Sequence, residues 1–238
     1  MSAEILGIIP ARGGSKGVLR KNIRPLAGKP LLYYTVEAAN TSSMLGRVLV
    51  STEDGEIAGL AKDWGCEVLN RPVELSQDET PMLPVIQHVL EVLVCEEDYR
   101  PEITVILQPT APLRRAEHID GCLHLMMNTG AASVVSVSVV PAHYHPDWQF
   151  IINPEGELGT FSGRSLDQIL TRRQDLKRTF TRNGALYAIR TAMFQNSGSL
   201  YPEPCVAYVM ESEDSINIDS EEDFWLAEQY LLRRKGNT

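Results

Sequence analysis

Residues 8–22 read IIPARGGSKGVLRKN, and the rest of the sequence can be understood outward from this stretch. The apolar run from Ile5 to Ile9 ends at Pro10, as expected of a buried strand that gives way to a loop. The loop mixes glycines with cations. Glycines allow backbone N–H groups to approach a ligand closely, so the stretch predicts a phosphate-binding loop at the end of the first strand.

This loop belongs to a basic island in an acidic protein. The chain has a formal net charge of -9, from 22 basic and 31 acidic residues, yet no acid occurs between Glu4 and Glu37. The cations in this interval are Arg12, Lys16, Arg20, Lys21, Arg24 and Lys29. A local excess of positive charge indicates an anionic ligand. The alternative is a solvated glycine turn with surface cations.

Composition and charge argue against several classes of protein. The chain has 238 residues, of which 43% are hydrophobic and 22% charged, as in ordinary globular proteins. The pI of about 5.1 argues against nonspecific binding to nucleic acid or anionic membranes. No apolar run approaches the ~20 residues that span a bilayer, and no signal-peptide pattern is present, so we expect a cytoplasmic protein.

Hydrophobic periodicity predicts strands that alternate with helices along most of the chain. Strands are expected at residues 4–9, 47–51, 66–69, 103–107, 132–140, 183–190 and 206–210. Helices are expected at residues 30–40, 56–64, 84–96, 117–128, 191–196 and 221–234. This alternation predicts an α/β fold with a mostly parallel central sheet.

Residues 141–182 break the alternation. They contain three prolines, a turn at 154–156 and a basic stretch from Arg164 to Arg182. We interpret them as an excursion, β-rich and suited to contacts between subunits, within a single domain of residues 1–238. The basic stretch is either a solvated face or a surface that binds the carboxylate or phosphate of a ligand, across a dimer.

The glycine loop matches neither common phosphate-binding motif. It lacks the G-x-G-x-x-G spacing of dinucleotide sites and the G-x-x-x-x-G-K-[ST] spacing of P-loop NTPases. It is a longer loop, in which the N–H groups of Gly13, Gly14 and Ser15 would bind oxyanions while Lys and Arg side chains neutralise phosphates. A triphosphate suits this arrangement.

Two other segments carry polar groups at places where ligands bind. Gln108-Pro109-Thr110 follows a predicted parallel strand and could contact a base or a sugar, or could simply be a strand-ending turn. Asn217 and Asp219 face the same side of an extended segment. Their oxygens suit Mg²⁺ shared with substrate phosphates, although Asp219 could instead help to cap the helix that follows.

The opening loop, with Lys21-Asn22 after it, resembles the first motif of CMP-sialic acid synthetases (acylneuraminate cytidylyltransferases). The similarity is collinear over essentially the whole chain. It continues through Val50-Ser51-Thr52-Glu53, Asn70-Arg71-Pro72, Leu107-Gln108-Pro109-Thr110-Ala111-Pro112-Leu113-Arg114, Asn183-Gly184-Ala185-Leu186-Tyr187 and Asp214-Ser215-Ile216-Asn217-Ile218-Asp219.

This resemblance implies a three-layer, Rossmann-like nucleotidyltransferase fold. It also implies transfer of CMP from CTP to the anomeric hydroxyl of a nonulosonic, sialic acid-like 2-keto sugar acid, with release of pyrophosphate. Mg²⁺ and a homodimer in which the excursion reaches the neighbouring subunit are further implications. One departure concerns the metal, because the family commonly has Asp-x-Asp where this chain has Asn217-Ile218-Asp219.

The motifs and this resemblance together assign expected roles to individual residues. Those expected to bind the nucleotide are Arg12, Gly13, Gly14, Ser15, Lys16, Lys21, Asn22 and Arg71, the last beside the cytosine. Those expected to bind the sugar acid are Gln108, Thr110, His145, Arg173 and Asn183. The expected metal ligands are Asp219 and Asn217, and the expected catalytic residues are Arg12, Lys21 and Asp219.

Two alternatives are left open by the sequence. The same fold could serve a nucleotidyltransferase with another acceptor, such as Kdo, a phosphonate or a sugar phosphate. Alternatively, the chain could bind CTP without turning it over, which the amide at Asn217 would favour.

Overall fold

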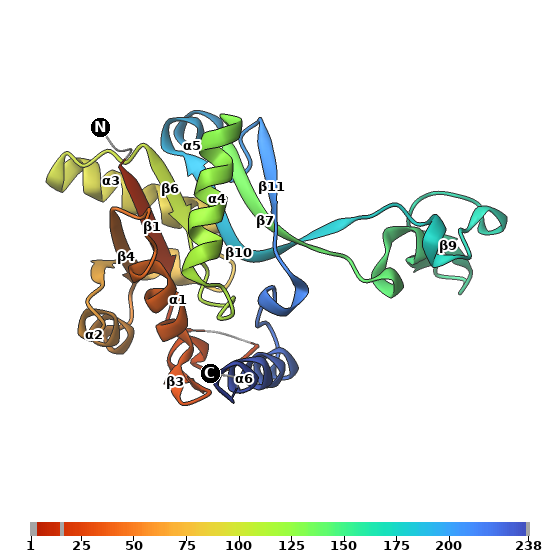
Figure 1. Cartoon of the computed structure of the whole chain (residues 1–238), viewed down its shortest axis with the longest axis horizontal. Helices are drawn as coiled ribbons and strands as arrows, with labels where there is room; N and C mark the ends of the chain where they lie inside the picture. The colour runs from red at the N-terminus through yellow and green to blue at the C-terminus, as the bar shows by residue number, and fades with distance from the viewer. Residues whose placement is uncertain (1–3, 15–16, 237–238) are drawn as a thin grey trace.

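The structure is a computed structural model that describes residues 4–14 and 17–236. A central sheet carries helices on both faces, and a long arm projects from one end of the body (Figure 1). The strands of the sheet are β1 (Ile5–Pro10), β4 (Arg47–Thr52), β5 (Glu67–Asn70), β6 (Ile103–Ile106), β7 (Ser133–Val139), β10 (Phe180–Arg190) and β11 (Cys205–Val209). The helices are α1 (Leu31–Asn40), α2 (Gly55–Asp63), α3 (Met82–Glu97), α4 (Ala116–Thr129), α5 (Thr191–Ser197) and α6 (Glu221–Gly236).

The order of the strands places a reversal beside β1. The sheet runs β11-β7-β10-β6-β1-β4-β5, and neighbouring strands are parallel except that β10 is antiparallel to β6 and β7. The chain passes from β1 to β4 and β5 on one side, then crosses to β6 on the other side of β1. Ligands of open α/β sheets bind beyond the carboxyl ends of strands at such a reversal. The loops after β1 and β6 therefore frame the expected site.

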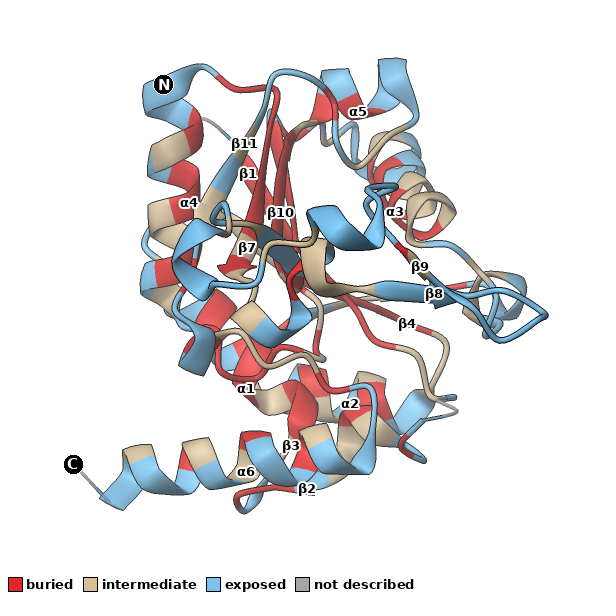
Figure 2. Ribbon diagram, turned by 90° about the vertical axis from the view of Figure 1, so that its right-hand side faces the viewer, coloured by how far each residue is buried: buried red, intermediate tan, exposed pale blue. Residues whose placement is uncertain are grey.

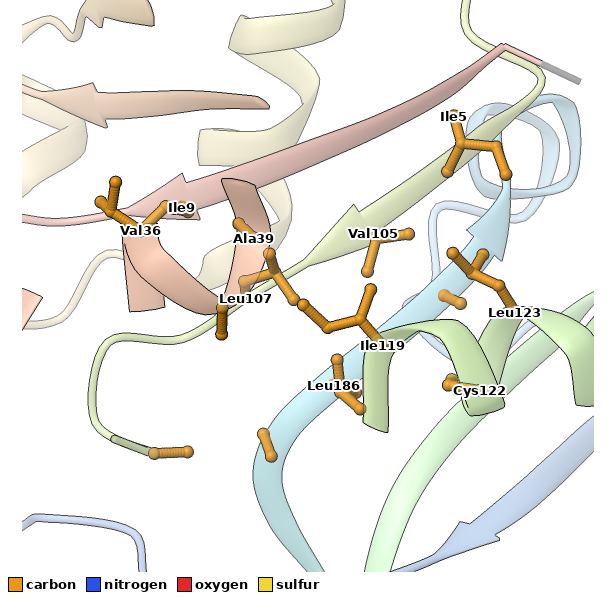
Figure 3. Packing of buried hydrophobic residues seen from close by; sticks show 14 of the residues in the cluster. Ile5, Ile9, Val36, Ala39, Val105, Leu107, Ile119, Cys122, Leu123 and Leu186 are labelled. Carbon is orange, nitrogen blue, oxygen red and sulfur yellow. The ribbon is translucent and has the colours of Figure 1, made fainter. Parts of the chain in front are cut away.

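Helices bury both faces of the sheet. On one face, Val36 and Ala39 of α1 and Ile119 and Leu123 of α4 pack against the strands (Figure 3). Helices α3 and α5 cover the other face. Every residue of β1 and β6 is consequently buried, which explains why apolar residues occupy both faces of these strands, with Thr104 as the polar exception in β6. The predicted α/β fold with a mostly parallel sheet is confirmed.

The last helix lies outside the sheet, beside α1 and a small hairpin (Figure 2). Phe224 and Leu231 of α6 pack with Tyr34 of α1 and with Leu26 of the hairpin. This hairpin consists of β2 (Pro25–Leu26) and β3 (Lys29–Pro30). It was not predicted, because strands of two residues carry no detectable periodicity. Pro30 belongs to the hairpin, so α1 begins at the next residue rather than at Pro30 as expected.

The arm occupies the interval between β7 and β10 and overlaps the predicted excursion. Its two strands, β8 (Phe150–Ile152) and β9 (Leu158–Thr160), form an antiparallel pair. The short 3-10 turns of the chain are η1 (Lys21–Ile23), η2 (Val73–Ser76), η3 (Ala142–Tyr144), η4 (Pro146–Trp148), η5 (Leu166–Gln168), η6 (Arg173–Asp175) and η7 (Ser212–Asp214). Four of them, η3 to η6, lie in the arm. Within the described ranges, no helix is both long and apolar enough to cross a membrane.

A buried carboxylate joins α6 to α4. Asp214 contacts Arg234 of α6, and its Oδ2 lies 3.3 Å from both Arg115 Nη2 and His118 Nε2. Only 8% of the Asp214 side chain is exposed, so the contacts are partly shielded from water. They link segments that the sequence separates by about a hundred residues.

We expect Asp214→Ala to lower the free energy of unfolding by about 2–3 kcal/mol, since it removes the buried carboxylate that Arg234, Arg115 and His118 share. Urea denaturation followed by circular dichroism measures the loss. Glu213→Ala changes the exposed carboxylate next to it and serves as the control. Equal stability of the two variants would show that Asp214 does not hold α6 in place.

Candidate active site

A cleft of about 360 Å³ opens at the carboxyl ends of β1 and β6, where the strand order reverses. Most of the residues singled out from the sequence line it, although they come from four separate segments. These residues are Arg12, Gly14, Lys21, Asn22, Arg71, Gln108, Thr110, Asn217 and Asp219. Ser15 and Lys16, also predicted to bind nucleotide, lie outside the described residues.

The loop after β1 is fastened by contacts of its own and of distant segments. Asn22 Nδ2 donates to the Arg12 carbonyl oxygen at 2.8 Å, which closes the loop on itself. Arg12 Nη1 donates to the Gln77 carbonyl oxygen at 3.0 Å and lies 2.9 Å from Asp78 Oδ1. The N–H group of Gly13, expected to face an oxyanion, donates to Glu53 instead, at 2.8 Å.

Lys21 stands where this loop meets the segment before α6. Its Nζ donates to the Ile218 carbonyl oxygen at 2.6 Å and lies 3.8 Å from Asp219 Oδ1. Burial lowers the pKa of the Lys21 ammonium group, and the carboxylate of Asp219 opposes that shift. The two segments touch so closely that a Cβ at Gly17 would collide with the Asp219 carbonyl oxygen, which explains why a glycine is needed there.

A buried cation, Arg114, stabilises the turn after β6 through hydrogen bonds. Arg114 Nη1 donates to the carbonyl oxygens of Gln108 and Ala185, at 3.0 and 2.9 Å. Burial lowers the pKa of the Arg114 guanidinium to about 9. These bonds fix the turn against β10. Sequence reasoning did not single out Arg114 as a residue that supports the site.

Three segments meet around Gly184 of β10. This residue has a φ of 70°, and a Cβ there would lie 2.9 Å from Gln108 Oε1 and 3.1 Å from Asn217 Oδ1. The Ile218 N–H group donates to the Thr110 carbonyl oxygen at 2.8 Å, which adds a direct link between the turn after β6 and the segment before α6. The side chains of Gln108 and Asn217 therefore share one wall of the cleft.

Asn217 and Asp219 suit a cation that a ligand helps to hold. Asn217 Nδ2 donates to Asp219 Oδ2 at 2.5 Å, while the buried Asn217 Oδ1 has no hydrogen-bond partner among the described residues. An orphaned carbonyl oxygen beside an exposed carboxylate matches the oxygen ligands that Mg²⁺ prefers. No group of three or more His, Cys, Asp or Glu side chains in the described part could hold a metal. Phosphate oxygens would have to complete the coordination.

The alternative role of Asp219 as a helix cap is not supported. Ser220 Oγ accepts from the Asp223 N–H group at 3.2 Å, and Asp223 Oδ2 accepts from Ser220 N at 2.8 Å. This reciprocal pair forms a capping box at the start of α6. The Asp219 carboxylate is thus left facing the cleft.

Three predicted sugar-binding residues do not reach the cleft of their own chain. Asn183 is buried; its Oδ1 accepts from Ser136 Oγ at 2.6 Å and its Nδ2 donates to Ser215 Oγ at 2.9 Å. His145 is buried inside the arm, where Nε2 contacts the Lys177 carbonyl oxygen at 2.7 Å. Arg173 is exposed on the arm. The amide of Asn183 thus has its hydrogen-bond partners within the chain.

The cleft also has a wall formed by the chain that follows Arg71. The segment between β5 and α3 contributes Leu75, Gln77, Asp78 and Thr80, and α3 contributes its first residue, Met82. The contact of this segment with Arg12 was not predicted, because it joins residues that are far apart in the sequence. No local sequence signal identifies that contact.

Comparison with known proteins agrees with this geometry. A family model described as Cytidylyltransferase matches residues 6–196. The chain is 35% identical over 232 residues to the CMP-N,N'-diacetyllegionaminic acid synthase of Legionella pneumophila, and the match covers 96% of each protein. It is 33% identical over 237 residues to an N-acylneuraminate cytidylyltransferase of Escherichia coli, which covers 100% of this chain and 54% of that protein.

The chain thus spans about half the length of several of the relatives that it matches. Among solved structures, CMP:2-keto-3-deoxy-manno-octonic acid synthetase complexed with CTP has a TM-score of 0.72 at 16% identity, covering 98% of this chain and 100% of that one. At this identity the likeness shows a shared fold alone. The family model and the relative matched over nearly its whole length are stronger evidence, and they show that the chain belongs to the cytidylyltransferase family.

Proposed function

We propose that this protein transfers CMP from CTP to the anomeric hydroxyl of a nonulosonic, sialic acid-like 2-keto sugar acid and releases pyrophosphate. One observation carries the proposal. A single cleft at the reversal of the sheet joins the cationic loop after β1, the turn at Gln108 and Thr110, and the oxygen ligands Asn217 and Asp219. The relatives named for CMP-legionaminic acid synthesis and N-acylneuraminate cytidylyl transfer support this choice of acceptor.

In the proposed reaction, the hydroxyl oxygen of the sugar acid forms a bond to the α-phosphorus of CTP as the bond to pyrophosphate breaks. Such a displacement needs positioning and neutralisation of charge more than covalent help from the protein. Lys21 would serve this task, because it lines the cleft and its ammonium group lies 3.8 Å from Asp219 Oδ1. Arg12 would neutralise charge that develops on the leaving pyrophosphate.

The contacts of Arg12 imply an exchange of anions. In the structure, its guanidinium lies 2.9 Å from the carboxylate of Asp78. A triphosphate carries more negative charge than one carboxylate and offers several oxygens to a guanidinium. CTP would therefore replace Asp78 as the partner of Arg12. Arg71 and the segment between β5 and α3 would then border the cytosine.

Mg²⁺ fits this site, with Asp219 and Asn217 as the protein ligands. When bound, it would neutralise phosphate charge and lower the pKa of the attacking hydroxyl group. The site has no second carboxylate. Instead, the Asn217 amide donates a hydrogen bond to Asp219 and fixes the position of the Asp219 carboxylate.

We also infer that a second copy of the chain covers the arm. Large apolar side chains are exposed there, although the arm projects away from its own body (Figure 1). They include Phe150, Ile151, Ile152, Leu158, Phe161 and Leu166. A two-fold symmetric dimer would bury this surface and bring the exposed Arg173 to the cleft of the partner, where it would meet the carboxylate of the sugar acid. His145, being buried, would support the arm.

The first test is release of pyrophosphate from CTP in the presence of sialic, legionaminic, pseudaminic or Kdo acid. We expect turnover with at least one nine-carbon acid and its loss in EDTA, followed by recovery when Mg²⁺ is added in excess. Absence of turnover with every acid, or activity undiminished by EDTA, would contradict the proposal. Turnover with Kdo alone would show that the acceptor is assigned wrongly.

Lys21→Ala and Asp219→Ala should each lower kcat about 100-fold or more, because each removes a group that stabilises charge in the transition state. Lys62→Ala and Asp63→Ala, on the exposed end of α2, make the same changes in charge away from the cleft and should retain full activity. Thermal unfolding checks that all four variants fold. A wild-type rate in either cleft variant would remove that residue from the mechanism.

The dimer is tested by light scattering after size exclusion. The wild-type protein should have twice the mass of the 26.5 kDa chain. Ile152→Asp places a charge on the exposed side of β8 and should yield a monomer, whereas Leu232→Asp, which alters an exposed leucine on α6, should remain dimeric. A monomeric wild-type protein would refute the proposed interface.

A further inference from the structure

Glu53 lies directly after β4 and behind the cleft. Only 15% of its side chain is exposed, and it is not among the residues that line the cleft. Its carboxylate is placed between the glycine loop after β1 and the segment after β5. These are the two places where the proposed function puts the triphosphate and the cytosine.

Each carboxylate oxygen of Glu53 holds one of these segments. Oε1 accepts the N–H group of Gly13 at 2.8 Å, and Oε2 accepts from Arg71 Nη2 at 3.0 Å. Burial by itself would raise the pKa of the Glu53 carboxyl, but hydrogen bonds from Gly13, its own backbone, Arg71 and Ser76 together outweigh burial, so the net shift is downward. The group is therefore a carboxylate at neutral pH, which is the form that accepts both bonds.

Arg71 depends on this contact for its orientation. Only 4% of its side chain is exposed, and its Nε atom has no hydrogen-bond partner in the described part of the chain. A buried guanidinium needs its charge neutralised, and Glu53 is the carboxylate that pairs with it in the structure. Loss of the pair would leave Arg71 free to turn away from the cleft.

We infer that Glu53 is a positioning residue for CTP, which couples the phosphate-binding loop to the cytosine-binding Arg71 through one buried carboxylate. This inference rests on the proposed function, because it assumes that the cleft binds CTP. Glu53 touches neither substrate. It acts by fixing the distance between Gly13 and Arg71, so both ends of the nucleotide meet groups that are already in place.

Glu53→Gln tests this directly. The glutamine has nearly the same shape, and its oxygen still accepts from Gly13, but its NH₂ group then faces the NH₂ group of Arg71, donor against donor. We expect the Kd and the KM for CTP to rise about tenfold or more, since a hydrogen bond between charged groups is lost. The KM for the sugar acid and kcat should change much less, and the preference for CTP over UTP should fall.

Glu97→Gln is the matched control. Glu97 pairs with Arg47, the first residue of β4, so it makes the same kind of contact at the opposite end of the same strand. This variant should bind CTP as the wild type does. Glu53→Asp is a second variant at the same position. Its side chain keeps the charge but is too short to accept hydrogen bonds from both Gly13 and Arg71. The Glu53→Asp variant should show the same CTP-specific loss, and thermal unfolding monitors the folding of all three.

A double-mutant cycle with Arg71→Met separates positioning from general damage. If Glu53 acts through Arg71, the loss of CTP affinity in the double variant should be smaller than the two single losses combined. Full additivity, or CTP binding by Glu53→Gln and Glu53→Asp as tight as in the wild type, would overturn the inference. Failure of the wild-type protein itself to bind CTP would instead overturn the proposed function.

Discussion

The hydrogen bond from Lys21 Nζ to the Ile218 carbonyl oxygen is the contact on which the rest of the cleft depends, because it joins residues 197 positions apart. Ile218 also donates its N–H group to Thr110, so one residue connects the loop after β1 with the turn after β6. Its side chain is fully buried among Val18, Leu26 and other apolar residues. The segment before α6 is thus anchored by packing on one side and by hydrogen bonds to both cleft-forming loops on the other.

The carboxylates that pair with cations of the basic island come from residues that the fold brings near, not from neighbours in the sequence. The basic island contains no acid of its own, yet distant acids neutralise much of it. Arg12 meets Asp78, while Arg24 Nη1 lies 2.5 Å from Glu221 Oε1. The structure therefore places carboxylates against these cations. Under the proposed function a triphosphate would compete with Asp78 for Arg12, so the gain in affinity would be smaller than the number of cations alone suggests.

The sequence predicts those parts of the structure that depend on interactions between residues close together in the chain. The seven strands of the sheet follow from apolar runs and flanking turns, and the capping box at Ser220 follows from a four-residue pattern. The hairpin at residues 25–30 has strands too short for any periodicity. Asn183 was expected in the sugar site, but its amide is occupied by Ser136 and Ser215, which lie 47 and 32 residues away. Glu53 and Arg114 support the cleft through partners that only the folded chain brings together.

The charge of Asp219 explains why an amide, rather than a second carboxylate, suits position 217. A carboxylate there would face Asp219 across the same side of an extended segment, and two like charges so close repel each other when no cation is bound. The amide donates to Asp219 instead, at 2.5 Å, and leaves its carbonyl oxygen beside Gly184. This hydrogen bond consequently holds the segment that is proposed to bind Mg²⁺ in shape. With one carboxylate instead of two, the segment offers less negative charge to Mg²⁺. The proposed metal site therefore depends more strongly on the phosphates of the nucleotide, and nucleotide and metal should bind cooperatively.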